Sequence, residues 1–550
     1  MKTGIAMLAL VLVLAACGTS KSLRHRPQTQ GYDLSVPQID KFDAANFLSG
    51  NNSLRKNPQG LWELYVEGDP LQIGLQTGAL EDSLLKKQER VFFSKVRQLV
   101  PSRSRQKWLR KLLTWYNRKL YLNVPEEYKT EIYGLSRYSS HDYDFIATPY
   151  LRSLYLHGAH DIGHAMQDLA LVGCSSFAAW GDKSEDGSLI LGRNFDFYAG
   201  DDFAKDKVVA FVKPDRGHPF MMVTWPGMIG AVSGMNNQGL TVTINAAKSK
   251  IPLVAKTPIS ILTREILQYA STIEEAVAIA RKRDVFVSES IMIGSAQDNS
   301  AALIEVAPDN FGVYHVQNNQ LICSNHFQSD ALKDDKRNLY QIENSHSQYR
   351  YDKLAEELNE NPKINPLIAA GILRDRSGLG DQSIGYGNEK ALNQMLAHHG
   401  VIFKPKERLV WVSANPYQMG AFVCYDLEKV FSQQRPAGGS MAEVPLEIPA
   451  DPFLATQAYK DYEQFRIEDR EMDQFLENKT GLTADFIKKY QSLNPDFWVV
   501  YYKPGRYFYD NKDYRSAKIQ LEEALTKEIT TLLARKEIEK MLRKINRKLK

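Results

Sequence analysis

Apolar and polar residues recur with two different periods along the chain, and the change falls near residue 174. Upstream, Ser83 to Leu99 and Ser102 to Leu122 place apolar residues at three- and four-residue spacing, which predicts helices, and LWELYVEGD before them predicts a strand. Downstream, short alternating or apolar runs broken by Gly, Asn and Asp predict a series of strands. These runs are SSFAAWG, SLILGRN, KVVAFVKP, FMMVTW, GLTVTINA, IMIGSA, AALIEVA, FGVYHV and LICSN.

Two helices interrupt this series of strands. The segment ISILTREILQYASTIEEAVAIARKR contains two helical periods, with Ser271 or Thr272 as the N-cap of the second helix. The strand-like runs LVWVSAN and GAFVCYDL follow later in the chain. This order of elements predicts an α+β unit of stacked sheets and helices.

A helical part follows this unit at the C-terminus, after a Pro- and Gly-rich stretch at residues 433–452. There, Pro504, Gly505, Tyr514 and Leu521 match small and large positions of a tetratricopeptide repeat, which predicts one helical hairpin. The final helix is basic. A solvated face is the simplest interpretation, and contact with anionic lipid or a protein partner is the alternative.

The first residues resemble an export signal. Lys2 precedes an apolar run from Ile5 to Leu14 that is too short to span a bilayer. The run ends in LAACG, which resembles a bacterial lipobox, so we expect a lipid on Cys17. The protein would then be anchored in the bacterial cell envelope, facing the periplasm or on the outer membrane. An ordinary cleaved signal with a chance cysteine is the alternative.

Composition limits the function classes. Hydrophobic residues make up 43% and charged residues 24% of the 550 residues, which is ordinary for a globular protein with more than one core. The formal net charge of +4, without a broad basic and aromatic face, argues against nucleic-acid binding. Cys323 and Cys424 lie in apolar strand-like runs, where buried free thiols are commoner than a disulfide.

The candidate chemistry centres on Cys174, where the helical region ends and the strands begin. An N-terminal cysteine has its own α-amino group as a general base, with an unperturbed pKa of about 8. Cys174 becomes N-terminal only if its peptide bond to Gly173 breaks, by attack of the thiol on the Gly173 carbonyl and hydrolysis of the thioester. A glycine at this position tolerates a strained backbone.

One predicted β-hairpin later, the segment GRNFD would return alongside Cys174. Arg193 would favour the thiolate, and Asp196 would hold and orient the new α-amine. A strand-end turn with a surface ion pair is the alternative interpretation.

The pair GCSSF and GRNFD resembles the cysteine N-terminal-nucleophile (Ntn) hydrolases. It is most similar to the self-processing acyl-coenzyme A:6-aminopenicillanic acid acyltransferase family, with the bile salt and penicillin V amidases (choloylglycine hydrolases) as more distant relatives. The resemblance covers roughly residues 60 to 430. It implies a four-layer αββα fold, Cys174 as nucleophile with Arg193 and Asp196, no cofactor, and an upstream piece that stays bound after cleavage.

Three further segments resemble parts of the same family. GMNNQGLTVTINA would place an oxyanion-hole donor on the backbone N–H of Asn245, and CSNHF would place a second on the side chain of Asn325. NSHSQYRYDKL resembles a segment with a Ser and an Arg, which fall on Ser347 and Arg350. LGDQSIGYGNEKALNQMLAHHGVIF matches the closing pattern in outline only.

Two other sites compete with this interpretation. A helix with His157, His160, Asp161 and His164 has the spacing of metal ligands, but polar contacts near the cleavage junction explain it more simply, and we expect no metal. His326 beside Asn325 suggests a papain-like Cys–His pair, but the local signature of those enzymes is missing.

The sequence therefore predicts an autoproteolytic Ntn hydrolase or acyltransferase that acts on the amide bond of a small N-acyl substrate through a thioester. A bile salt, a penicillin-like amide, an N-acyl amino acid and a peptidoglycan fragment are all open as substrates. A lipid-anchored scaffold whose C-terminal helices hold a protein partner is the alternative. The predicted organisation is a lipoprotein signal peptide at 1–17, a tether at 18–45, a helical pro-segment at 46–173, the Ntn-hydrolase domain at 174–432, a linker at 433–452 and tetratricopeptide-like helices at 453–550.

Overall fold

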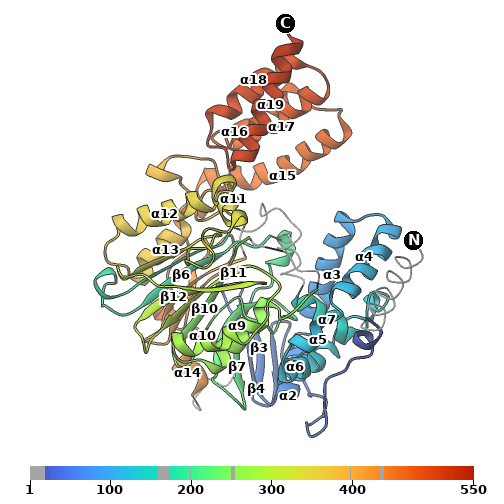
Figure 1. Ribbon diagram of the computed structural model, residues 1–550, viewed down its shortest axis with the longest axis vertical. Helices are drawn as coiled ribbons and strands as arrows, with labels where there is room; N and C mark the ends of the chain where they lie inside the picture. The colour runs from blue at the N-terminus through green and yellow to red at the C-terminus, as the bar shows by residue number, and fades with distance from the viewer. Residues whose placement is uncertain are drawn as a thin grey trace, which may run out of the picture.

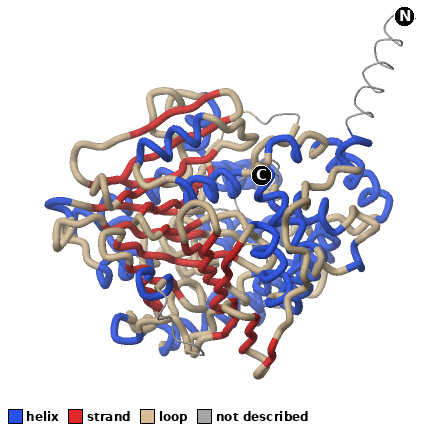
Figure 2. Tube along the Cα trace, turned by 90° about the horizontal axis from the view of Figure 1, so that it is seen from below, coloured by secondary structure: helices blue, strands red, loops and turns tan. Residues whose placement is uncertain are grey.

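Two β-sheets lie in the centre of the molecule, and helices surround them (Figure 1). The computed structural model describes residues 19–158, 173–198, 200–248, 250, 254–396, 398–432 and 439–550. Figure 2 shows the strands gathered in the middle of the molecule with helices on either side. The α+β class predicted from the sequence is confirmed.

The larger sheet has eleven strands in the order β1-β2-β3-β4-β7-β8-β9-β10-β11-β12-β13. Its neighbouring strands pair antiparallel except β4 and β7, which pair in parallel. Because β4 precedes Cys174 and β7 follows it, both sides of the predicted cleavage point share one sheet. The strands are β1 (Asp40–Lys41), β2 (Asn46–Ser49), β3 (Asn52–Lys56), β4 (Trp62–Gly68), β7 (Val208–Pro214), β8 (Phe220–Thr224), β9 (Ser233–Asn236), β10 (Leu240–Ala246), β11 (Glu289–Ser295), β12 (Ser300–Ala307) and β13 (Asn310–Tyr314).

The smaller sheet has six strands in the order β14-β5-β6-β15-β16-β17. Its β5–β6 hairpin is the one predicted from the sequence, and the register sets Arg193 opposite Ser176. The hairpin therefore returns GRNFD to the start of β5, beside Cys174. The strands are β5 (Ser175–Ala179), β6 (Ile190–Phe195), β14 (Gln320–Cys323), β15 (His399–Lys404), β16 (Leu409–Ser413) and β17 (Phe422–Asp426).

Three buried cores define the layers. Ala178 and Leu191 of the smaller sheet pack with Val209 and Leu303 of the larger sheet in the central core. A second core joins α2, α6 and α9 to the outer face of the larger sheet, and a third joins α12 and α13 to the smaller sheet. The predicted four-layer αββα order is therefore confirmed. The helices of this unit are α2 (Pro70–Leu80), α3 (Asp82–Leu99), α4 (Arg103–Tyr116), α5 (Leu120–Asn123), α6 (Glu126–Ser136), α7 (Pro149–His157), α9 (Ile259–Tyr269), α10 (Ile273–Arg281), α11 (Lys336–Asn344), α12 (Ser347–Glu360), α13 (Pro366–Arg374) and α14 (Leu427–Phe431).

The segment upstream of Cys174 differs from the prediction in two ways. Strands β1, β2 and β3 precede the expected strand β4, and they are too short and polar to show a clear alternation in the sequence. The helix predicted to run to Leu122 ends at Tyr116. There the backbone N–H of Arg118 donates to the carbonyl of Trp115 and not to that of Thr114, so the α-helical hydrogen-bond pattern ends.

The C-terminal helices form a separate group at the top of Figure 1. They include the predicted hairpin, α17 and α18, in which a Cβ on Gly505 would lie 2.8 Å from Leu521, so a glycine permits the close packing. Their core also takes in Met395 and Met419 from loops of the α/β unit. In α19 the apolar stripe is buried, and Lys536, Lys540, Arg543, Lys544, Arg547 and Lys548 are exposed, which both interpretations of this basic face predict. The helices are α15 (Gln457–Asn478), α16 (Ala484–Leu493), α17 (Val499–Asp510), α18 (Tyr514–Thr526) and α19 (Leu532–Lys548).

None of the helices in the described part of the chain is long and apolar enough to cross a membrane.

Candidate active site

Cys174 lies directly before β5 and is 1% exposed. Its Sγ accepts a hydrogen bond from Nη2 of Arg193 at 3.7 Å, and the backbone N–H of Asp196 also donates to it. Burial raises the pKa of the Cys174 thiol, and the positive charge of Arg193 opposes that rise. The predicted trio of Cys174, Arg193 and Asp196 is thus brought together in space.

Arg193 is fully buried and its guanidinium is held on several sides. Nη1 donates to the carbonyl of Val232 at 2.9 Å, and Nη2 donates to the carbonyl of Ile244 at 2.5 Å. The guanidinium also lies 4.3 Å from the centre of the Phe195 ring. A cation fixed in this way holds its charge at the sulfur without reorganisation.

Among the described residues, one carboxylate oxygen of Asp196 has a hydrogen-bond partner and the other has none. Nε2 of Gln418 donates to Oδ1 at 3.2 Å, whereas Oδ2 has no hydrogen-bond partner among the described residues. Burial raises the pKa of Asp196 to about 7, although the charge of Arg350 works against it. A buried acceptor without a donor is costly, so this oxygen marks a place that suits an added N–H group.

Arg350 joins Cys174 to Asn325 through a forked set of hydrogen bonds. Nη1 donates to the carbonyl of Cys174 at 2.5 Å and to Oγ of Ser175 at 2.8 Å. Nη2 donates to Oδ1 of Asn325 at 2.6 Å. The arginine from the predicted segment therefore contacts the backbone of Cys174 itself.

Ser347 fixes the loop that carries Asn325. Its Oγ accepts from the backbone N–H of Asn325 at 2.8 Å and lies 2.8 Å from Nδ1 of His326. Burial and the charge of Arg350 lower the pKa of His326 to about 4, so this ring is neutral near pH 7. His326 is thus hydrogen-bonded to Ser347, which does not support its pairing with Cys174 as a base.

The side-chain amide of Asn325 is connected to Cys174 through Arg350. Its Nδ2 donates to the carbonyl of Ala246 at 2.8 Å, and an amide nitrogen carries a second hydrogen. Since Arg350 holds Oδ1, the orientation of this amide is set from both ends.

Asn245 contributes its side chain to the site. Oδ1 accepts from Oγ of Ser176 at 2.9 Å, and Nδ2 donates to the carbonyl of Cys323 at 3.2 Å. The N–H of Ile244 donates to Val232 on the β9 side. Because successive N–H groups of a strand point to opposite sides, that of Asn245 points toward β11, where Asn245 pairs with Ser290. The predicted oxyanion role of this N–H stays a prediction.

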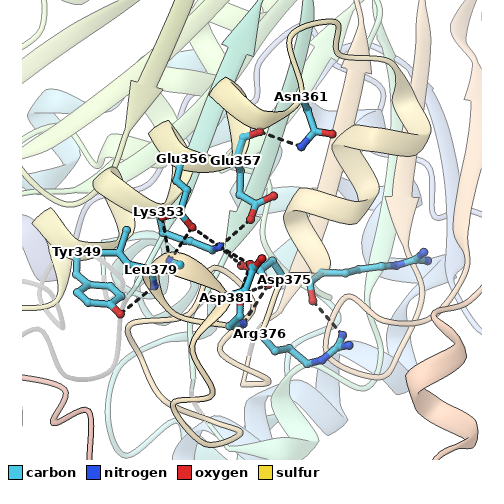
Figure 3. Close-up of polar contacts among 12 residues, drawn as sticks. Tyr349, Lys353, Glu356, Glu357, Asn361, Asp375, Arg376, Leu379 and Asp381 are labelled. Carbon is cyan, nitrogen blue, oxygen red and sulfur yellow. Dashed lines mark hydrogen bonds and ion pairs between the residues drawn. The ribbon is translucent and has the colours of Figure 1, made fainter.

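A buried lysine anchors α12, the helix that carries Arg350. Figure 3 shows the ammonium of Lys353 among carboxylates, at 2.7 Å from Glu356, 2.8 Å from Glu357 and 3.1 Å from Asp381. Burial alone would lower the pKa of Lys353, but these carboxylates outweigh it and raise that pKa. The three acidic groups lie close enough to surround a cation, and Lys353 supplies that charge.

Two glutamines complete the site and were missed from the sequence. Nε2 of Gln394 donates to the carbonyl of Gly173 at 2.8 Å, and Gln418 donates to Asp196 as described above. Gln394 lies in the run NQMLAHHG, where other polar residues stand beside it and nothing in the sequence distinguishes this glutamine. Neither glutamine belongs to a motif with a spacing that could have indicated it.

Gly173 is needed for packing. Its φ lies outside the left-handed region, so the structure gives no support to backbone strain as the reason for a glycine. A Cβ at this position would lie 2.0 Å from Nε2 of Gln394, so any side chain would displace that glutamine.

Some of the residues singled out in the sequence lie outside the described part of the chain, and others have partners of their own. Cys17, His160, Asp161 and His164 lie outside the described residues. Both ring nitrogens of His157 are engaged, Nδ1 with the carbonyl of Ser153 at 2.7 Å and Nε2 with the N–H of Ile229 at 3.0 Å. Cys323 and Cys424 are buried free thiols.

A family model described as acyl-coenzyme A:6-aminopenicillanic acid acyl-transferase matches residues 183–415. The resemblance seen in the sequence is therefore confirmed over this range, which begins after Cys174 and includes Arg193, Asp196, Asn325 and Arg350. Over these residues the chain is similar to this acyltransferase family.

Two curated proteins are similar over part of their length. An uncharacterized protein from Archaeoglobus fulgidus is 27% identical over 277 residues, which is 47% of this chain and 45% of the relative. Protein dcd1B from Dictyostelium discoideum is 21% identical over 335 residues, which is 57% of this chain and 60% of the relative. The matches thus span about half the length of these relatives.

Two solved structures are also similar. The Caenorhabditis elegans N-acylethanolamine-hydrolyzing acid amidase ortholog is 18% identical with a TM-score of 0.32, covering 42% of this chain and 93% of that one. A mutant of the conjugated bile acid hydrolase from Clostridium perfringens is 12% identical with a TM-score of 0.32, covering 46% of this chain and 93% of that one.

Proposed function

We propose that this chain is a cysteine Ntn hydrolase or acyltransferase that cleaves itself between Gly173 and Cys174. The mature enzyme then transfers the acyl group of a small N-acyl amide, through a thioester on Cys174, to water or to an amine. The observation that carries this proposal is the buried Sγ of Cys174, held by Arg193 beside an Asp196 carboxylate, one oxygen of which has no partner in the described part of the chain.

Self-cleavage begins with attack of the Cys174 sulfur on the Gly173 carbonyl carbon. A C–S bond forms, the peptide C–N bond breaks, and the proton lost by the thiol goes to the departing nitrogen. Water then hydrolyses the thioester, which leaves a carboxylate on Gly173 and a free thiol and amine on Cys174. The charge of Arg193 favours the thiolate that attacks.

The new α-amine serves as the base in turnover. It takes the thiol proton as the sulfur attacks the substrate carbonyl, and it returns that proton to the leaving amine. Oδ2 of Asp196 is suited to hold this amine. The free amine would donate the hydrogen bond that Oδ2 lacks among the described residues, and it would compensate the buried charge of the carboxylate. The amide of Asn325 donates to the substrate oxyanion.

The two pieces of the cleaved chain stay together. Strand β4 of the upstream piece pairs with β7 of the downstream piece over seven residue pairs, from Trp62 with Val208 to Gly68 with Pro214. Separation would break this central pairing and expose the core beneath it. The upstream piece is thus a permanent subunit.

The lipid anchor on Cys17 belongs to the same proposal. The LAACG sequence supports it, and it would place the enzyme at the surface of a bacterial envelope membrane. Labelling with an alkyne fatty acid should mark the wild type and not Cys17→Ala. Equal labelling of both proteins would contradict the anchor.

Intact-protein mass spectrometry tests the enzyme proposal. The wild type should yield two polypeptides divided before Cys174, whereas Cys174→Ala should remain one chain and be inactive. Cys174→Ser should cleave slowly, because a hydroxyl is a poorer nucleophile at neutral pH. Cys323→Ala, which removes a different buried thiol, is the matched control and should cleave normally.

Two results would contradict self-cleavage by Cys174. One is full cleavage of Cys174→Ala, and the other is a wild type that remains a single chain. The second result would favour the binding scaffold instead. After cleavage, a panel of N-acyl amides with hydroxylamine as acceptor would show acyl transfer as hydroxamate formation.

A further inference from the structure

The carbonyl oxygen of Gly173 has a donor of its own. Nε2 of Gln394 lies 2.8 Å from this oxygen, inside the range of about 2.7–3.1 Å that suits stabilisation of an oxyanion. The Gln394 side chain is 3% exposed, so water competes little for the contact. The oxygen is the atom that would gain negative charge when Cys174 attacks.

Neighbouring residues hold Gln394 in position. Nδ2 of Asn194 in β6 donates to the carbonyl of Leu392 at 2.9 Å, and the hydroxyl of Tyr462 in α15 donates to the carbonyl of Met395 at 3.0 Å. The backbone is therefore tied on both sides of Gln394, once to the catalytic hairpin and once to the C-terminal helices. A donor fixed in this way needs little reorganisation during reaction.

The donors that surround Cys174 itself serve a different oxygen. Arg350 contacts the carbonyl of Cys174 and Oδ1 of Asn325, and these contacts lie on the far side of the peptide bond that must break. Gln394 thus contacts the Gly173 oxygen, whereas Arg350 contacts the Cys174 carbonyl and the Asn325 side chain.

We propose that Gln394 is the oxyanion donor of self-cleavage, distinct from Asn325, which serves the substrate. As sulfur adds to the Gly173 carbonyl carbon, the C=O bond becomes a C–O⁻ bond whose charge the Gln394 amide stabilises. When the C–N bond breaks, the carbonyl re-forms as the thioester. This inference rests on the proposed self-cleavage.

The same contact explains the residue before the nucleophile. A side chain at residue 173 would collide with Nε2 of Gln394, at 2.0 Å from the Cβ position. Gly173→Ala should therefore slow cleavage by displacing the donor. Combined with Gln394→Leu, it should slow cleavage little further, because both changes remove the same interaction.

Pulse–chase labelling of the full chain in a cell-free system measures the cleavage rate directly on gels. Gln394→Leu removes the donor at similar volume and should slow cleavage about 10²–10³-fold, the usual loss for one oxyanion donor. Gln98→Leu is the matched control, because Gln98 is exposed on α3, and it should cleave at the wild-type rate.

A second variant keeps the test decisive if Gln394→Leu does not fold. Gln394→Glu keeps the shape but presents a carboxylate, which donates only when protonated. Its cleavage rate relative to the wild type should rise as the pH is lowered, whereas the relative rate of Gln394→Leu should not. A merely structural role would not produce this difference.

The outcomes separate the two proposals. One outcome refutes the role of Gln394 but leaves self-cleavage standing. In that outcome the wild type cleaves, Cys174→Ala does not, and both Gln394 variants cleave within about twofold of the wild-type rate. The loss of an oxyanion donor should slow cleavage far more than this. If the wild type does not cleave, the proposed function itself fails.

Discussion

Replacement of Arg350 by methionine or by lysine separates the geometric role of this side chain from its charge. Methionine has similar length but no donor, whereas lysine keeps the positive charge without the planar fork. Arg350 is fully buried and donates to Cys174, Ser175 and Asn325. Both substitutions break the fork, and only methionine removes the charge.

The size of the stability loss follows from the acceptors left behind. The Ser175 hydroxyl can rotate to another partner, but the carbonyl of Cys174, Oδ1 of Asn325 and Nδ1 of His346 would each lose a donor inside the protein. At about 1–3 kcal/mol for each buried unpaired acceptor, Arg350→Met should lower the free energy of unfolding by about 3–9 kcal/mol. The lower half of this range is expected, because a buried methionine avoids the desolvation cost of a guanidinium.

Urea titration measures this loss in a Cys174→Ala background, where every sample is a single chain. Arg374→Met is the matched control, since Arg374 is a buried arginine that donates to the carbonyls of Gly420 and Pro449 away from Cys174. It should also lose stability. The two variants should differ in the pH dependence of turnover, which is measured on processed protein.

Arg350 is the strongest influence that holds down the pKa of Asp196 against burial. Without its charge, that pKa should rise above about 7, so a higher pH is needed to ionise Asp196 and hold the α-amine. The rising limb of the kcat/KM profile should therefore move to higher pH in Arg350→Met and stay in place in Arg350→Lys and Arg374→Met. An Arg350→Met enzyme with unchanged stability and an unchanged pH profile would refute this reasoning.

Three further substitutions test other contacts. Asn325→Ala, measured on processed protein, should lower kcat by about 10²–10³-fold with a far smaller effect on KM, because the donor acts on charge that exists only in the transition state. A normal kcat would show that Asn325 is not the oxyanion donor for the substrate. Lys353→Ala should let Ca²⁺ bind among the carboxylates left without their ammonium, so Ca²⁺ should raise the melting temperature of this variant but not of the wild type. The pKa of Asp196 rises from 3.8 to about 7 on folding, so the folded chain keeps a proton that the unfolded chain loses, and stability falls as the pH rises between these values. In the Cys174→Ala background, Asp196→Asn should remove up to about 4 kcal/mol of this fall in urea titrations at pH 4 and pH 7, and an equal fall in both proteins would contradict the assignment.

The sequence predicted those parts of the site whose residues lie close together along the chain. GCSSF and GRNFD are two arms of a single hairpin, so their spacing was enough to bring Arg193 and Asp196 back to Cys174. The hairpin of α17 and α18 and the cap of α10 at Thr272 were likewise local, and the structure confirms both.

The remainder depends on contacts between distant segments. The direction of the Asn245 N–H is set by which strands flank β10, and no local pattern in the sequence specifies its neighbours. Gln394 and Gln418 reach Gly173 and Asp196 across 221 and 222 residues of chain. A single polar residue in a loop carries no period, so these partners become visible only in three dimensions.

The packing of the C-terminal helices on Met395 and Met419 has a consequence for the order in which the molecule is completed. These methionines adjoin Gln394 and Gln418, and Tyr462 closes over Met395. During synthesis, every strand of the site exists before α15 has left the ribosome. A chain that ends at the linker would therefore hold the β5–β6 hairpin, while the loops of Gln394 and Gln418 would lack the apolar cover of the C-terminal helices. If Gln394 serves the proposed self-cleavage, that reaction should wait until α15 is made and packed.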